Sequence, residues 1–211
     1  MDVDRPEPGA ELNTGAPTVP RLAATVILLR GCDTSLEVLL VQRTPAARFM
    51  GGAWVFPGGA VDRDEGDGQA ALRAAALREL HEEAGVVLDT DAELVLFARW
   101  ITPEAVRTRF DTWFYLALAP EGVSPQVDGA EIVDCRWLSP SDALAAGAAG
   151  DLLLVFPTIK QLEQLSAFAS AQELLDHARR AEVTPIQPRV LVSGETARIV
   201  LPGEPGYEAP G

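Results

Sequence analysis

The helix predicted at Ala70–Ala84 constrains the fold of this chain more than any other segment. It is rich in Ala, Leu, Arg and Glu, all of which favour helix, and Gly85 follows it as a helix-ending residue. Glu79, Glu82 and Glu83 stand at positions i, i+3 and i+4, so a helix places their side chains on one face. Apolar side chains of the same stretch point to a different face, which can pack on a sheet. The fold must therefore bury one side of this helix and leave an anionic side accessible.

The three glutamates favour a bound divalent cation. Carboxylates this close repel one another and raise their own pKa values, and a cation removes that cost. Hard oxygen ligands of this kind suit Mg²⁺ or Mn²⁺. The alternative is a solvated helix face with Glu–Arg ion pairs, and Arg78, one turn before Glu82, offers such a pair. The upstream turn Phe56–Gly59, of sequence Phe-Pro-Gly-Gly, favours the metal site, because glycine lets a backbone carbonyl approach an ion closely.

The rest of the pattern predicts a mixed sheet with helices inserted between its strands, an α/β layered fold. Strands are expected at Leu22–Leu29, Leu36–Gln42, Ala53–Phe56, Glu93–Ile101, Thr112–Ala119 and Glu131–Leu138, with a strand or hairpin at Arg189–Leu201. Further helices are expected from Ser139, at Thr158–Phe168 and at Ala171–Ala181, and a polar loop at Val61–Gly68. Residues 1–20 are acidic and rich in Pro and Gly, which predicts a disordered tail. Residues 21–205 then form a single domain with a C-terminal helical extension.

Charge and composition exclude several classes of function. The net charge of −14 and a pI near 4.5 argue against nucleic-acid binding, which needs cations to neutralise phosphates. No apolar run approaches the ~20 residues of a membrane span, and the N-terminus is unlike a secretory signal. We therefore expect a cytoplasmic protein with no membrane partner. Cys32 and Cys135 are expected to be ordinary thiols, and His81 and His177 solvated helix residues.

These residues resemble the Nudix box, whose pattern is Gly, five residues, Glu, seven residues, then Arg-Glu-aliphatic-x-Glu-Glu-x-Gly-aliphatic. Gly59, five residues and Glu65 match its first half, and Arg78–Val86 matches its second half in full. Between them stand twelve residues, Gly66–Leu77, where the pattern has seven. We expect this insertion to lengthen the loop before the helix, which leaves the role of Glu65 open. The resemblance implies a Nudix-type α/β/α sandwich with a mixed sheet and extra C-terminal helices.

The family resemblance also implies hydrolysis of a nucleoside diphosphate linked to another moiety, with Mg²⁺ or Mn²⁺ as cofactor. The three helix glutamates would bind the metal, and one of them would act as the general base. Gly59 would offer its carbonyl to the metal, and Arg78 would orient a helix carboxylate. Some members use an additional acid outside the box. Glu131 is the candidate here, and a surface position at a strand edge is its alternative.

A second resemblance, to the coenzyme A diphosphatase signature, lies in Leu39–Gly59. That signature reads Leu-Leu-Thr-x-Arg-Ser/Ala, three residues, Arg, three residues, Gly, three residues, Phe-Pro-Gly-Gly. Arg43, Arg48, a glycine and the final Phe-Pro-Gly-Gly are in register, whereas a Val and a Thr depart from it. The stretches Arg99–Pro103 and Arg109–Thr112 are also similar to the peroxisomal coenzyme A diphosphatases and their bacterial relatives, which tend to carry a longer box loop.

The subgroup resemblance implies cleavage of coenzyme A or acyl-coenzyme A to 3′,5′-ADP and (acyl-)phosphopantetheine. The 3′-phosphate of coenzyme A needs extra cations, and its adenine can stack on an aromatic ring. The candidate substrate contacts are Arg43, Arg48, Arg107, Arg109, Phe110, Trp100 and Trp113. Surface or loop-pairing roles for the arginines, and core positions for the aromatic residues, are the alternatives.

Other functions stay open at this point. ADP-ribose or a dinucleotide would be cleaved by the same chemistry. A non-catalytic Nudix module would bind a nucleotide or a protein, although such modules usually lose box carboxylates, and all three are present here. Nudix enzymes are often dimers, and a homodimer through the tail or through residues 158–181 is one option that the sequence leaves undecided.

Overall fold

The computed structural model describes residues 13, 15–31, 35–47, 49–193 and 196–208. Its strands are β1 (Arg21–Arg30), β2 (Glu37–Arg43), β3 (Trp54–Val55), β4 (Gly58–Ala60), β5 (Val95–Ile101), β6 (Phe110–Leu118), β7 (Ile132–Leu138), β8 (Arg189–Ser193) and β9 (Thr196–Val200). Its helices are α1 (Gly68–Ala84), α2 (Pro140–Ala149), α3 (Phe156–Leu165) and α4 (Ala171–Ala178). Arg48, Cys32 and most of the predicted tail lie outside the described residues.

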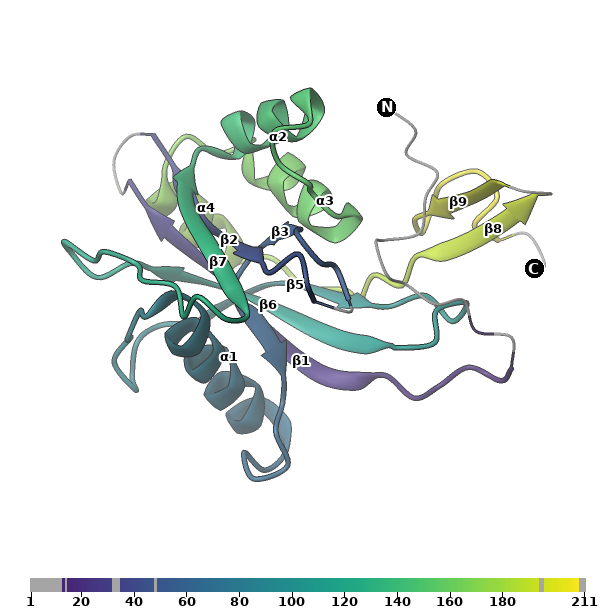
Figure 1. Ribbon diagram of the computed structural model, residues 1–211, viewed down its shortest axis with the longest axis horizontal. Coiled ribbons are helices and arrows are strands. Elements are labelled where there is room, and N and C mark those ends of the chain that lie inside the picture. Colours follow the sequence, from purple (N-terminus) through teal and green to yellow (C-terminus); the bar gives the residue numbers. More distant parts are fainter. Residues whose placement is uncertain (1–12, 14, 32–34, 48, 194–195, 209–211) are drawn as a thin grey trace.

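One mixed sheet carries the fold, with strand order β3-β2-β1-β6-β5, β4 paired to β1 and β7 paired to β2 (Figure 1). β1 runs parallel to β6, from Arg21 opposite Phe110 to Leu29 opposite Leu118. On its other edge β1 has two antiparallel partners, because β4 pairs with its first half and β2 with its end. β4, which pairs with the first half of β1, contains Gly58 and Gly59 of the predicted turn.

Helices cover both faces of this sheet, which confirms the predicted α/β/α sandwich. Figure 1 shows α1 on one side of the sheet and α2 and α3 on the other. Ile27 and Leu29 of β1 belong to a core that includes residues of α3 and α4, whereas Val26 and Leu28 belong to the core on the α1 side. β1 is apolar at nearly every inner position because both of its faces are buried.

Two local expectations were wrong, and both errors concern the segment around α1. Gly58 and Gly59 were read as part of a turn, but together with Ala60 they pair with β1 as a short strand, and no local sequence pattern predicts this pairing. The insertion in the box was expected to lengthen a loop. Instead, all of Gly66–Leu77 apart from its first two residues is helical. Ala71 and Leu72 in that stretch are buried, so the extra residues extend α1 along the sheet.

The C-terminal part follows the predicted order with small shifts. α3 begins two residues earlier than expected, with Pro157 in its first turn, where proline is well tolerated. Ser139 caps α2 as predicted, because its hydroxyl accepts the N–H of Asp142. β8 and β9 form an antiparallel hairpin within Arg189–Leu201. Within the described ranges, none of the helices has the length and apolar character needed to cross a membrane.

Candidate active site

A cavity of about 580 Å³ lies over the face of the sheet that α3 covers. Its floor consists of alternate residues of neighbouring strands, Ala23 and Thr25 of β1 and Thr112 and Phe114 of β6. Alternation of this kind is how a strand presents side chains to one face. The start of α3, residues 155–158, forms a wall. At the β4 edge of this floor the glutamates of α1 reach the cavity.

Glu83 is the most enclosed of the three helix glutamates, with 4% of its surface exposed. Its Oε2 accepts the backbone N–H of Gly58 at 2.8 Å, and Nη1 of Arg43 lies 3.8 Å from its Oε1. Burial raises the pKa of Glu83 to about 8. The hydrogen bond from Gly58 acts to lower this pKa, whereas the nearby charge of Glu79 raises it further. The carboxyl group therefore stays largely protonated at neutral pH unless a further positive charge arrives.

Glu79 lies directly against the backbone of Gly59. A Cβ on Gly59 would stand 2.2 Å from Oε1 of Glu79, closer than real Cβ contacts come, so the side chain can occupy this place only beside a glycine. Burial raises the pKa of Glu79, although a hydrogen bond from Arg78 opposes the shift. The structure thus brings together the Gly59 backbone and the helix carboxylates that the sequence assigned to one site.

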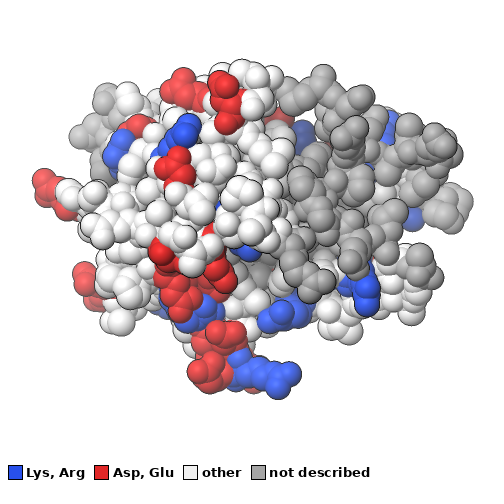
Figure 2. Space-filling view, in the orientation of Figure 1, with Lys and Arg blue, Asp and Glu red and all other residues white. Residues whose placement is uncertain are grey.

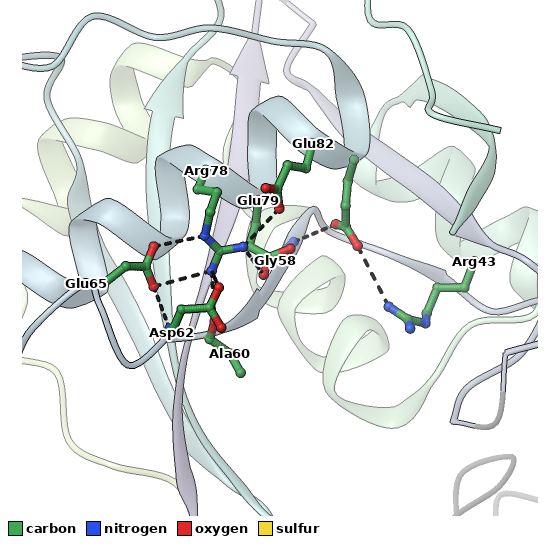
Figure 3. Close-up of polar contacts among 9 residues, drawn as sticks. Arg43, Gly58, Ala60, Asp62, Glu65, Arg78, Glu79 and Glu82 are labelled. Carbon is green, nitrogen blue, oxygen red and sulfur yellow. Dashed lines mark hydrogen bonds and ion pairs between the residues drawn. The ribbon is translucent and has the colours of Figure 1, made fainter. Parts of the chain in front are cut away.

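Arg78 connects these carboxylates to the loop before the helix (Figure 3). Its Nη1 donates to Oε1 of Glu79 at 2.8 Å and to Oε2 of Glu82 at 2.9 Å, and its Nη2 donates to the carbonyl of Ala60 at 3.0 Å. Its Nε donates to Oε1 of Glu65 at 3.0 Å. These partners, Glu65 first, raise the pKa of Arg78 above its already high ordinary value. The guanidinium holds two box carboxylates in place, which is the geometry expected of a residue that orients them.

Glu65, whose role the sequence left open, is the anchor of that guanidinium. Besides Arg78, it binds the backbone N–H of Asp62 through its Oε2 at 2.6 Å. Burial acts to raise the pKa of Glu65, but the hydrogen bonds from Arg78 and Asp62 outweigh it and lower the pKa. Glu65 therefore remains ionised and positions Arg78, even though the stretch between them is longer than the pattern predicts.

The remaining acids are more open to solvent. The side chain of Glu82 is 56% exposed. Glu131 is also exposed, lines the cavity, and adds to the raised pKa values of both Glu79 and Glu83 through its charge. Figure 2 shows Asp and Glu side chains gathered over α1 and the loop before it. The anionic side expected of the helix is therefore present on the surface of the fold.

The predicted substrate contacts divide into two groups. Arg43 and Phe110 line the cavity. Arg109 does not: it is buried, and its guanidinium donates to the carbonyls of Thr102 at 3.0 Å and Thr18 at 2.6 Å. Arg109 thus links the segment before β1 to the connection after β5. The loop-pairing alternative therefore describes Arg109 better than the predicted substrate contact.

Three other candidates have separate positions. Arg107 is exposed and is not part of the cavity lining, and its carbonyl accepts the hydroxyl of Thr18 at 2.8 Å. Trp100 lines the cavity. Trp113 lies on the α1 side of the sheet, where the guanidinium of Arg99 covers its ring at 4.7 Å.

The sequence did not point to several residues of the cavity. Thr25 of β1 lies on the floor, and Phe49 and Met50 lie in the wall that the β2–β3 connection provides. Val190 and Ile199 of the C-terminal hairpin complete another wall. No local signal distinguishes these residues, because their positions depend on strand pairing between distant segments.

The layered fold and the carboxylate-lined cavity define an α/β/α protein with an acidic site at the edge of its sheet. Residues 19–156 match the family model of the NUDIX domain, and this chain belongs to that family.

Named relatives share the match. The chain is 30% identical over 180 residues to nudix hydrolase 7 of Caenorhabditis elegans, covering 69% of this chain and 60% of that protein. It is 28% identical over 116 residues to acyl-coenzyme A diphosphatase NUDT19 of Homo sapiens, covering 53% of this chain and 31% of that protein. The chain therefore spans less than two thirds of the length of either relative.

Solved structures agree on the fold. The crystal structure of a NUDIX hydrolase from Alicyclobacillus acidocaldarius has a TM-score of 0.68 at 27% identity and covers 75% of this chain and 96% of its own. The NUDIX domain of Shewanella oneidensis NrtR, crystallised with ADP ribose, has a TM-score of 0.53 at 26% identity, and the match covers 70% of this chain and 86% of the NrtR chain.

Proposed function

We propose that this protein hydrolyses the pyrophosphate bond of a nucleoside diphosphate derivative with the aid of Mg²⁺ or Mn²⁺. The observation that carries the proposal is the pair of carboxyl groups, Glu79 and Glu83, which lie against the backbone of Gly58 and Gly59 at the edge of a cavity of about 580 Å³. Two acids in such surroundings have no evident structural purpose, since burial disfavours their ionised forms.

The chemistry of these donors fits a divalent cation. Among the residues that the structure describes, no three acidic, His or Cys side chains converge into an assembled metal centre. Burial nevertheless raises the pKa values of Glu79 and Glu83, so the ionised form of each carboxyl group would be stabilised by a further positive charge. Glu79, Glu82, Glu83 and the carbonyl of Gly59 would hold the cation, and its hard oxygen preference matches them. When bound, it would offset the charge that develops on the pyrophosphate oxygens and lower the pKa of an attacking water.

The protein's own residues have defined parts in this proposal. Arg78 fixes the positions of Glu79 and Glu82, and Glu65 fixes Arg78. One of the helix glutamates accepts the proton of the attacking water, as a general base must. Arg43 lines the cavity beside Glu83 and is placed to meet a phosphate oxygen. Glu131 is the proposed additional acid at the cavity mouth.

Coenzyme A or acyl-coenzyme A is the proposed substrate, cleaved to 3′,5′-ADP and (acyl-)phosphopantetheine. The signature in Leu39–Gly59 and the similarity to acyl-coenzyme A diphosphatase NUDT19 support it. The cavity is large enough for a ligand of this class, and Phe110 offers an aromatic face to adenine. ADP-ribose is the second candidate, because the similar domain of NrtR was crystallised with it, and a dinucleotide pyrophosphate would undergo the same reaction.

The test is turnover of coenzyme A, dephospho-coenzyme A and ADP-ribose with Mg²⁺ present, followed by mass analysis of the products. Glu82→Gln should lose ~10²-fold or more in kcat, as expected for removal of a general base or an electrostatic stabiliser. Glu121→Gln, an exposed acid in the turn after β6, is the matched control and should keep wild-type rates.

Each outcome decides between the readings. A kcat/KM that does not fall when the 3′-phosphate is removed would contradict the coenzyme A assignment, and faster cleavage of ADP-ribose would favour the second candidate. Absence of turnover in wild type and Glu82→Gln alike, on every substrate, would leave a non-catalytic nucleotide-binding or protein-binding module as the better description.

A further inference from the structure

The C-terminal hairpin lies beyond the family match at residues 19–156, yet it lines the cavity. Val190 of β8 and Ile199 of β9 are direct partners in the hairpin register, so their side chains share one face, and both belong to the cavity lining. We infer that this face is a subsite for an acyl group carried by the substrate, and that Val190 and Ile199 determine acyl specificity. The inference rests on the proposed coenzyme A chemistry.

The strand register places this wall far from the carboxylates. Ala60 of β4 pairs with Ala23 of β1, Ala23 with Thr112 of β6, Thr112 with Trp100 of β5, and Trp100 with Ile186 just before the hairpin. These partners form one row across the sheet with four steps between neighbouring chains. At about 4.8 Å per step the row is about 19 Å long. The glutamates of α1 stand at one end of it and the hairpin begins at the other.

That separation suits the length of a pantetheine arm. The arm has a backbone comparable to four residues of extended chain, so it reaches roughly 14 Å from the pyrophosphate. An acyl group on its thiol would therefore begin close to the hairpin. Val190 and Ile199 offer neither charge nor hydrogen bonds, so they suit an apolar chain and not the phosphate of a nucleotide.

The hairpin is held in place from two sides. Ile186 exchanges two backbone hydrogen bonds of 2.8 Å with the end of β5. Behind the hairpin, the hydroxyl of Tyr207 donates to the carbonyl of Gln187 at 2.8 Å, and the guanidinium of Arg189 donates to the carbonyl of Tyr207. The guanidinium also lies over the Tyr207 ring at 5.9 Å. The wall is thus supported at its base and on its outer face.

The experiment compares octanoyl-coenzyme A with free coenzyme A in wild type, Val190→Ser and Ile199→Ser. We expect each variant to lower kcat/KM for the octanoyl substrate about tenfold, mainly through KM, with free coenzyme A changed less than about twofold, because only the acyl group meets the hairpin. Arg198→Ala is the matched control, since Arg198 is exposed and neighbours Ile199 on the opposite face of the hairpin. Its ratio of the two activities should equal that of wild type.

A filling variant gives an independent readout. Val190→Phe should move the preferred acyl chain to shorter lengths, because the added ring occupies the end of the subsite. Turnover of free coenzyme A shows that each variant is folded. If the ratio of octanoyl to free coenzyme A turnover is the same in wild type, Val190→Ser, Ile199→Ser and Val190→Phe, the acyl subsite is refuted while the proposed function stands. If wild type cleaves neither substrate, the coenzyme A assignment and the acyl subsite are refuted together, and turnover of ADP-ribose then decides whether the proposed pyrophosphate hydrolysis stands.

Discussion

The metal-free protein should lose stability as the pH rises, and Glu83→Gln should remove most of that loss. The cause is the burial of Glu83, which raises its pKa from the ordinary value of 4.5 to about 8. Between these two values the folded state holds a proton that the unfolded state has already released. Because the folded state then binds more protons, the free energy of unfolding falls through this window as the pH increases.

The size of the effect follows from the two pKa values. Their difference of 3.5 units, 8 minus 4.5, is equivalent to about 5 kcal/mol across the whole window, at about 1.4 kcal/mol per unit. By pH 7 about 3 kcal/mol of this is lost, since the window is then only partly crossed. The raised pKa of Glu79 acts in the same direction. A glutamine at position 83 cannot ionise and so contributes no such slope.

Urea unfolding at pH 5 and pH 8.5, with EDTA present, measures the effect. The difference in unfolding free energy between the two pH values should be several kcal/mol larger for wild type than for Glu83→Gln, while Glu121→Gln should behave as wild type. Saturating Mg²⁺ should reduce the wild-type difference, because a cation favours the ionised carboxylates. Parallel pH dependence in wild type and Glu83→Gln would refute the reasoning.

Four further substitutions separate structural from catalytic roles. Gly59→Ala should lower kcat ~10²-fold with little loss of stability, because the added Cβ meets only the movable end of the Glu79 side chain. Gly58→Ala should instead destabilise the fold by about 1–3 kcal/mol, because its Cβ meets backbone atoms of β1. Urea unfolding and turnover, measured on the same samples, test both predictions. Arg78→Lys should lower kcat about tenfold or more at nearly unchanged stability, because an ammonium group cannot reach all the acceptors of the guanidinium. Equal kcat values for wild type and Arg78→Lys would contradict the orienting role of Arg78. Arg109→Ala should destabilise the folded protein by about 1–3 kcal/mol, because two carbonyls lose their hydrogen bonds, while kcat/KM stays near that of wild type. A raised KM without loss of stability would instead support the predicted substrate contact.

The helix and its acidic face could be predicted from the sequence because their signals are local. Spacing within one turn placed Glu79, Glu82 and Glu83 together, and the one-turn separation from Arg78 to Glu82 predicted an ion pair that the structure contains. Short runs of apolar and β-branched residues likewise located most strands to within a few positions. The structure adds that Glu82 is exposed and paired with Arg78, whereas Glu83 is buried, so a solvated helix face does not describe Glu83.

The parts that could not be predicted depend on contacts between distant segments. Arg109 belongs to a stretch that resembles the coenzyme A diphosphatases, but one of its partners, Thr18, lies far away in the sequence, before β1, and no spacing encodes that contact. The hairpin at Arg189–Leu201 was expected as an element, yet its place beside β5 depends on the single bridge at Ile186. The start of α1 was placed two residues too late, at Ala70, because Gly66 and Gly68 were read as loop residues, whereas the helix begins at Gly68 itself.

The parallel pairing of β1 with β6 has a consequence for how the molecule is made. Partners such as Arg21 and Phe110 are about 90 positions apart, so the floor of the cavity cannot close on a ribosome until β6 has emerged. Until then the apolar residues of β1 have no partner strand on the edge that later pairs with β6. The hairpin of β8 and β9, with its proposed acyl subsite, is made later still. The glutamates of α1 and this hairpin are thus made at different times, and a chain released early would carry its acids without the proposed acyl subsite.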